Sequence, residues 1–203
     1  MAIIKSGATS DTLTIDPTSK AARVTLYDSR GNSLGQKASY AASTAIKGTV
    51  LTGTGVWFAI YGSATKTVRV QRILATVTVA TAAVYGDLVV SKRTVAISGG
   101  TSSALTRVPL DSNSSAATVS LVNTYSVAPT PGTGGGAIGI IMAFCPITAT
   151  VTNGPGVFDF DWRYRAEMEA PVLRGTAQGL ELNFGTTTTN APTITVTVWW
   201  VEE

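Results

Sequence analysis

Apolar and polar residues alternate with a period of two along much of this chain. The clearest case is the C-terminal stretch 193–203, TITVTVWWVEE, in which Ile194, Val196, Val198 and Trp200 alternate with three threonines and Trp199. Successive side chains of a β-strand point to opposite faces of the sheet, so this pattern predicts a strand with one buried face. The most helix-like segment, 164–171, is short and is stopped by a proline.

Further stretches have the same composition and alternation, and residues typical of turns separate them. They cover residues 21–32, 56–62, 67–79, 87–97, 117–127, 157–165 and 180–185, together with 137–151, where a proline suggests two strands joined by a kink. About ten strands at this spacing predict an all-β protein, an antiparallel sandwich or barrel. We interpret it as a jelly-roll-like β-sandwich, while Greek-key and immunoglobulin-like topologies give the same pattern.

One segment interrupts this pattern. Residues 36–49 are small and polar and have no strand pattern, so we interpret them as a linker. Residues 1–35 then form an extended N-terminal arm or hairpin, and residues 50–203 form the sandwich domain. A single large domain with a terminal piece fits a chain of 203 residues.

Composition removes several classes of chemistry. The chain has no histidine, which excludes Ser-His-Asp and Cys-His catalysis and the commonest ligand of transition metals. Its one cysteine, Cys145, cannot form an internal disulfide and is expected to be a buried, inert thiol. Asp111, Asn113 and Ser114 fit a capped turn better than a cation loop. We therefore expect no metal, no cofactor and no enzymatic activity.

The charge of the protein is low and scattered. Charged residues make up 13% of the chain, about half the usual share, and the net charge is +3 without a basic run. Nucleic-acid binders concentrate positive charge, so we do not expect nucleic acid as a partner. The N-terminus lacks a signal-peptide pattern, and no apolar stretch is long enough for a membrane helix. A neutral surface of this kind is typical of proteins covered by neighbours in an assembly.

The sequence GTGGGAIG, residues 132–139, matches the dinucleotide-binding pattern G-x-G-x-x-G at Gly134, Gly136 and Gly139. That site needs a strand before the glycines and a helix after them. Here Pro129 and Pro131 precede the glycines, and β-branched residues follow. We therefore predict a flexible surface loop between two strands.

The stretch FDFDWRYR, residues 158–165, is the most amphipathic strand. Its two aspartates, Asp159 and Asp161, would lie roughly 6–7 Å apart on one face, close to the spacing in an inverting glycosidase. Arginines on that face would lower the pKa of both carboxyl groups, whereas catalysis needs one raised. We predict an aromatic face in the core and a charged face with cross-strand ion pairs, and keep a glycoside-acting enzyme as an alternative. The aromatic face is Phe158, Phe160, Trp162 and Tyr164; the charged face is Asp159, Asp161, Arg163 and Arg165.

The N-terminal stretch IIKSGATSDTLTIDPTSKAARVTLYDSRGNSLG, residues 3–35, resembles a leader segment of virion proteins of tailed bacteriophages and prophages, where it precedes differing domains. Residues 80–92, 108–133 and 171–184 resemble other phage structural proteins. The resemblance covers most of the chain and implies a virion component made in the host cytoplasm. None of its motifs is catalytic.

We expect a non-enzymatic phage structural protein, a capsid decoration or cement protein that binds the major capsid protein as a homotrimer. The arm would add strands to the sheet edge of a neighbouring subunit. Trp199 and Trp200 are adjacent, so we expect them to point to opposite faces of a strand, one toward the core and one toward a partner. A tail, baseplate or fibre-anchoring protein that binds host glycans is the alternative. The residues expected at assembly interfaces are Ile3, Ile4, Leu13, Ile15, Val24, Leu26, Trp199 and Trp200.

Overall fold

The computed structural model divides the chain into two compact units, Met1–Gln36 and Lys37–Glu203. In the first unit, strand β1 (Thr14–Ile15) pairs antiparallel with β2 (Ala22–Arg23). Every regular element among the described residues is a strand, as the all-β prediction required. The structure describes residues 14–15, 22–23, 37–44, 48–49, 55–79, 84–145, 156–163, 169–184 and 192–203.

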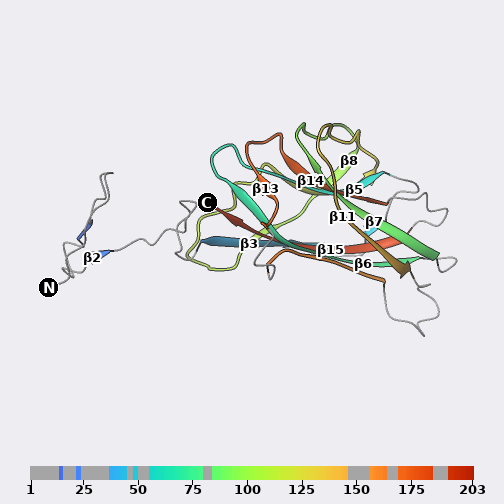
Figure 1. The fold of residues 1–203 in the computed structure, drawn as a ribbon, viewed down its shortest axis with the longest axis horizontal. Helices are drawn as coiled ribbons and strands as arrows, with labels where there is room; N and C mark the ends of the chain where they lie inside the picture. The colour runs from blue at the N-terminus through green and yellow to red at the C-terminus, as the bar shows by residue number, and fades with distance from the viewer. Residues whose placement is uncertain are drawn as a thin grey trace. The chain divides into compact units, whose positions relative to one another are not determined.

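The second unit consists of two antiparallel sheets that pack face to face (Figure 1). We call them the β6 sheet and the β14 sheet. The β6 sheet has the order β12 (Gly156–Asp161), β6 (Val68–Val79), β15 (Pro192–Glu202), β3 (Ala38–Ser43), β9 (Arg107–Pro109), with β13 (Val172–Leu173) paired to β6 and β4 (Gly48–Thr49) to β15. The β14 sheet has the order β11 (Gly136–Cys145), β7 (Val84–Arg93), β14 (Gly179–Phe184), β5 (Val56–Tyr61), β10 (Leu121–Val127), β8 (Thr101–Ala104).

The strand pairing is that of a jelly roll. Eight strands form it, in chain order β3, β5, β6, β7, β11, β12, β14 and β15. The first pairs with the eighth, the second with the seventh, the third with the sixth and the fourth with the fifth. Successive pairs alternate between the two sheets, so one long antiparallel ribbon is wound into a sandwich. The inserted strands β8, β9 and β10 lie between β7 and β11 in the chain and extend both sheets.

Alternation along the strands builds the core between the sheets. On β12, Phe158 and Phe160 are buried while Val157 and Asp159 are exposed, and β15 alternates in the same way as predicted. Trp200 of β15 is 1% exposed and its ring stacks on Tyr40. Each large apolar side chain buried in this way stabilises the fold by about 1.5–3 kcal/mol. The core therefore follows from the period-two pattern.

Strand β5 is buried along its whole length. Its residues Ala59 and Tyr61 form a second, smaller cluster with Val56 and Tyr125, against which Ile97 packs. Ile97 comes from the segment between β7 and β8, which covers this part of the β14 sheet. The sheet is therefore buried on both faces here, unlike an open antiparallel sheet with one solvated face.

The interpretation of residues 36–49 as a linker was wrong. Ala38–Ser43 form β3, which pairs with β15 along six positions and with β9 on its other side. The strand escapes a hydrophobic pattern because alanines and serines surround Tyr40, its one large apolar side chain. Tyr40 is fully buried and its hydroxyl donates to the carbonyl of Ser115, 2.9 Å away. This single aromatic anchors the strand.

Three other expectations met different outcomes. Of the stretch 137–151, the structure describes one strand, β11, which ends at Cys145; the expected kink and second strand lie outside the described residues. Of the helix-like segment 164–171, only residues 169–171 are described, and they are not helical. The expected strand at 117–127 begins later, at Leu121. The amides of Thr118 and Val119 donate instead to the buried carboxylate of Glu202.

Candidate functional site

The glycine-rich segment is a turn that leads into a strand. Gly134 and Gly135 have φ angles of 74° and 72°, in the left-handed region that favours glycine. Strand β11 begins at Gly136 and contains Gly139. No helix follows to direct amide groups at a phosphate, so the segment lacks the geometry of a dinucleotide site. The interpretation as a connection between strands is confirmed.

The same segment is not wholly on the surface, which corrects the sequence-based prediction. Gly132 is buried, and its amide donates to Oε1 of Glu181 at 2.8 Å. A side chain at this position would collide with the carbonyl oxygen of Val95 and with the hydroxyl of Tyr61. Glycine is required here because the chain passes directly over buried polar atoms.

Glu181 of β14 is the centre of this contact. The residue is fully buried, and the Tyr61 hydroxyl donates to its Oε1 at 2.6 Å. Arg93 of β7 donates from Nε to Oε2 at 2.9 Å. Both carboxylate oxygens are therefore bound, as a buried charge requires. We call Tyr61, Arg93, Gly132 and Glu181 the Glu181 cluster.

Tyr61 extends the Glu181 cluster to a second segment. Its hydroxyl oxygen accepts a hydrogen bond from the Ile97 amide at 3.0 Å. Burial, together with the hydrogen bond to Glu181, raises the pKa of Tyr61 far above its ordinary value. Tyr61 thus stays protonated and links the 94–98 segment to the sheet. The cluster therefore holds two covering segments, 94–98 and the one that contains Gly132, against the β14 sheet.

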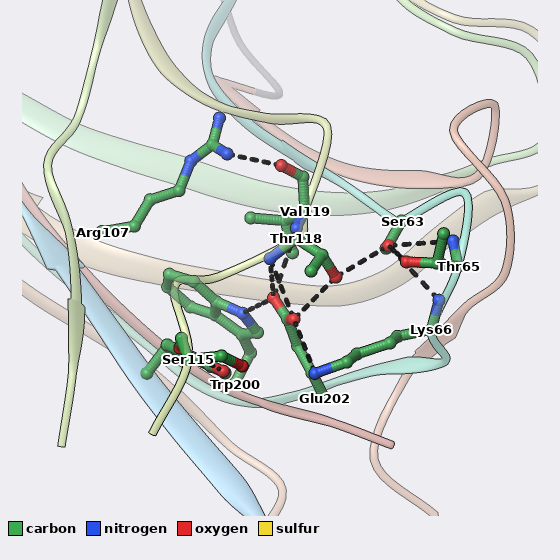
Figure 2. Close-up of polar contacts among 10 residues, drawn as sticks. Ser63, Thr65, Lys66, Arg107, Ser115, Thr118, Val119, Trp200 and Glu202 are labelled. Carbon is green, nitrogen blue, oxygen red and sulfur yellow. Dashed lines mark hydrogen bonds and ion pairs between the residues drawn. The ribbon is translucent and has the colours of Figure 1, made fainter. Parts of the chain in front are cut away.

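A second buried carboxylate, Glu202, lies at the end of β15 (Figure 2). The Thr118 amide lies 2.9 Å from both of its oxygens, and the Thr118 hydroxyl donates to Oε2 at 2.7 Å. The Val119 amide and Trp200 Nε1 donate to Oε1 at 3.2 and 3.0 Å. Lys66 Nζ lies 4.0 Å from Oε2. Fixed donors thus surround the charge.

Ser63 joins this cluster to the turn between β5 and β6. Its Oγ contacts Thr118 Oγ1 at 2.8 Å and accepts from the amides of Thr65 and Lys66 at 3.2 and 3.3 Å (Figure 2). Arg107 binds the Val119 carbonyl at 2.6 Å from the other side. We call Ser63, Lys66, Thr118, Trp200 and Glu202 the Glu202 cluster. It ties three segments that are distant in sequence.

The predicted charged face of β12 carries ion pairs. Arg72 of β6 binds Asp159 with two hydrogen bonds, of 2.8 and 2.7 Å. Arg163 binds Asp161 at 2.7 Å, and Arg72 lies 3.7 Å from the same carboxylate. The hydrogen bond from Arg163 lowers the pKa of Asp161 to about 2. Both aspartates are therefore ion-paired, and the lowered pKa of Asp161 is the opposite of the raised pKa that a general acid needs.

The adjacent tryptophans point to opposite faces, as predicted. Trp200 lies in the core and belongs to the Glu202 cluster, so its placement in an assembly interface was wrong. Trp199 is half-buried on the outer face of the β6 sheet, where the Arg72 guanidinium lies over its ring at 5.4 Å. This cation–π contact occupies one face of the indole that a sugar would use.

The remaining candidates divide by location. Of the expected arm residues, Ile15 belongs to β1, but its side chain, like that of Cys145, is outside the described part of the structure. Asp111 caps its own turn, because its Oδ1 accepts from the Asn113 amide at 2.9 Å. Within the described residues, no group of three metal-ligating side chains occurs. The other expected arm residues, Ile3, Ile4, Leu13, Val24 and Leu26, also lie outside the described residues.

Several large apolar side chains of the sandwich are exposed. Ile140 of β11 and Leu110 beside β9 are the most exposed, at 63% and 60%. Scattered apolar side chains are normal on a protein surface, so their position relative to sheet edges decides what they mean. The full set is Val95, Val108, Leu110, Val127, Ile138, Ile140 and Val157.

Sequence reasoning missed both buried carboxylates. A signal existed for Glu202, since it continues the apolar face of β15 two residues beyond Trp200. Glu181 had none, because alternation with Leu180 and Leu182 places it on the outer face. It is buried only because segments distant in sequence cover that face.

The comparisons with known proteins add no relative. No protein-family model, no curated protein and no solved structure matches the chain. In the part of the chain that the structure describes, no helix is long and apolar enough to cross a membrane.

Proposed function

We propose that this protein is a non-enzymatic structural component of a tailed-phage virion, a decoration or cement protein on the outside of the head. The observation that carries the proposal is the division of the chain. The stretch that resembles the leader of phage virion proteins spans residues 3–35, and the first compact unit ends at Gln36. An attachment unit followed by an independent sandwich is the organisation that such a leader implies.

The chemistry of the sandwich supports a structural role. Glu181 and Glu202 are bound on both oxygens by their own fold, and Asp161 is held ionised by Arg163. These carboxylates stabilise contacts between segments. Jelly rolls also recur in viral capsids, which is an argument by analogy with the fold alone.

The partner in this proposal is the major capsid protein, bound mainly through the N-terminal unit, with side chains at the edges of the sandwich as further contacts. With 13% charged residues, the interface would rest on apolar and main-chain contacts, and its affinity would depend little on salt. Binding of this kind contrasts with charge-driven association, which weakens steeply as salt rises.

The test is co-sedimentation of the full-length protein with purified heads from the same phage over a series of salt concentrations. We expect the affinity to fall by less than about tenfold between low and physiological salt, where an interaction driven by many ion contacts loses on the order of 10³-fold. Absence of binding to heads at every salt concentration would contradict the proposal. Binding to purified tails instead would favour a tail or baseplate protein.

A further inference from the structure

Among the described residues, the strand orders of the two sheets end in four strands, β8, β9, β11 and β12, and three of these carry features that disfavour backbone pairing with another chain. Strand β8 has only four residues, and β9 has three and ends in Pro109. Strand β12 carries the charged Asp159 and Asp161. Short length, proline and charge are the usual means by which proteins block sheet edges.

Strand β11 lacks these features. Its ten residues, GAIGIIMAFC, include no charge and no proline, and β7 is the one strand with which it pairs in the described part of the chain. Ile138 and Ile140 are 41% and 63% exposed. A bulge between Ala137 and Gly139 interrupts its first residues, but the register is unbroken from Gly139 to Cys145. A long apolar edge of this kind is a template for strand pairing.

Strand β12 of the other sheet lies close to β11 but does not pair with it. Phe160 of β12 packs on the backbone of Gly139 from the core side, so β11 and β12 meet through side chains across the sandwich. Among the described residues, no backbone hydrogen bond joins the two strands. The described strands therefore leave the outward N–H and C=O groups of β11 without a partner strand.

We propose that β11 pairs antiparallel with β11 of a second copy of this chain, so that the two β14 sheets become one continuous sheet. Antiparallel pairing of a strand with itself obeys a two-fold axis, which gives both copies the same contact. The two-fold axis also places each side chain of the strand opposite residues of the same strand in the other copy, so a charged strand would bring like charges together. Strand β11 carries no charge, whereas β12 would bring aspartates together.

This contact concerns the sandwich alone and holds whatever the location of the protein in a virion. It predicts a dimer, or a larger even-numbered assembly, in place of the trimer expected from the sequence. Exposed Ile140 would lie within the new interface. The other occupants of such an edge, a capsid strand or a trimeric neighbour, are distinguished by the oligomeric state of the purified protein.

The test measures the molar mass of the full-length protein by size-exclusion chromatography with light scattering. Wild type is expected to be dimeric, and Ile140→Lys monomeric with an unchanged circular dichroism spectrum. Val108→Lys is the matched control, because Val108 is a similarly exposed apolar residue, at 50%, on the blocked edge strand β9. It is expected to leave the dimer intact.

A second measurement does not depend on a variant. Amide hydrogen exchange of the wild type should slow in the peptide covering residues 138–145 as protein concentration rises, because dimerisation protects the free edge. A wild-type monomer at all concentrations, a trimer unaffected by Ile140→Lys, or exchange in β11 that is independent of concentration would overturn the proposal.

Discussion

At the scale of single residues, two buried carboxylates hold covering segments of the chain against the sandwich. Glu181 and Glu202 each accept hydrogen bonds from segments far away in the sequence. Burying a carboxylate is costly unless its oxygens are bound, so the donors must be in place when the fold forms. Displacing a segment that donates to either carboxylate is therefore expected to lower the stability of the whole sandwich.

Replacing Glu181 with Gln tests this role. The amide side chain has nearly the same shape, but its NH₂ group replaces one carboxylate oxygen, and that position can no longer accept either from Arg93 or from Tyr61 and Gly132. We expect the free energy of unfolding in urea to fall by about 3 kcal/mol. Glu203→Gln is the control: its carboxylate pairs with Lys37 and Arg69 near the surface, and its loss should cost about 1 kcal/mol or less. Equal effects of the two variants would contradict the account.

Asp161 predicts a pH dependence of stability. Its pKa is about 2 in the folded protein, against an ordinary value of 3.8. A lowered pKa contributes stability that is present above the ordinary value and is lost as pH falls toward the folded value. The urea midpoint of the wild type should therefore fall as pH decreases from about 4 to about 2, and that of Asp161→Asn should fall less. Parallel pH profiles would refute the assignment.

At the scale of elements, the sequence predicts strands wherever one face is apolar and alternates with polar residues. Strands β12 and β15 follow this rule, and their inward residues are those expected. Strand β3 does not, since Tyr40 is its only large apolar residue, and its position is fixed by pairing with β15. Covering segments also obscure the pattern, as at Glu181. Local periodicity therefore predicts most strands but not the polar clusters that non-local contacts create.

The segment that crosses the Glu181 cluster gives a matched pair of glycine variants. In Gly132→Ala the new methyl group would collide with Val95 and Tyr61, whereas at Gly136 no atom lies within 4 Å of an added Cβ. We expect Gly132→Ala to lower the free energy of unfolding by about 2–3 kcal/mol, through displacement of the segment and of its bond to Glu181. Gly136→Ala should change it by less than about 0.5 kcal/mol. Urea titration of both variants measures the difference.

At the scale of the whole molecule, the jelly roll joins strands that are far apart in sequence. Strand β3 pairs with β15, and β5 pairs with β14. Strand spacing predicted a sandwich, but it left Greek-key and immunoglobulin-like orders open, because each is compatible with the same alternation. The strand order is decided by which strands pair, and that depends on residues from both ends of the chain.

The two compact units predict a separation of roles. A protein lacking residues 1–36 should keep the cooperative urea unfolding of the sandwich, since the described core comes entirely from residues beyond 37. In the proposed function it should also lose binding to phage heads in co-sedimentation. Undiminished binding of the truncated protein would remove the attachment role from the N-terminal unit, and loss of cooperative unfolding would contradict the independence of the sandwich.

The proposed function places this protein on the outside of the phage head. Immunogold labelling of intact particles, with antibody raised against the sandwich unit Lys37–Glu203, tests it most directly. The account predicts gold spread over the surface of the head. Gold confined to the tail or to one vertex, or particles without gold when the protein is abundant in the infected cell, would contradict it.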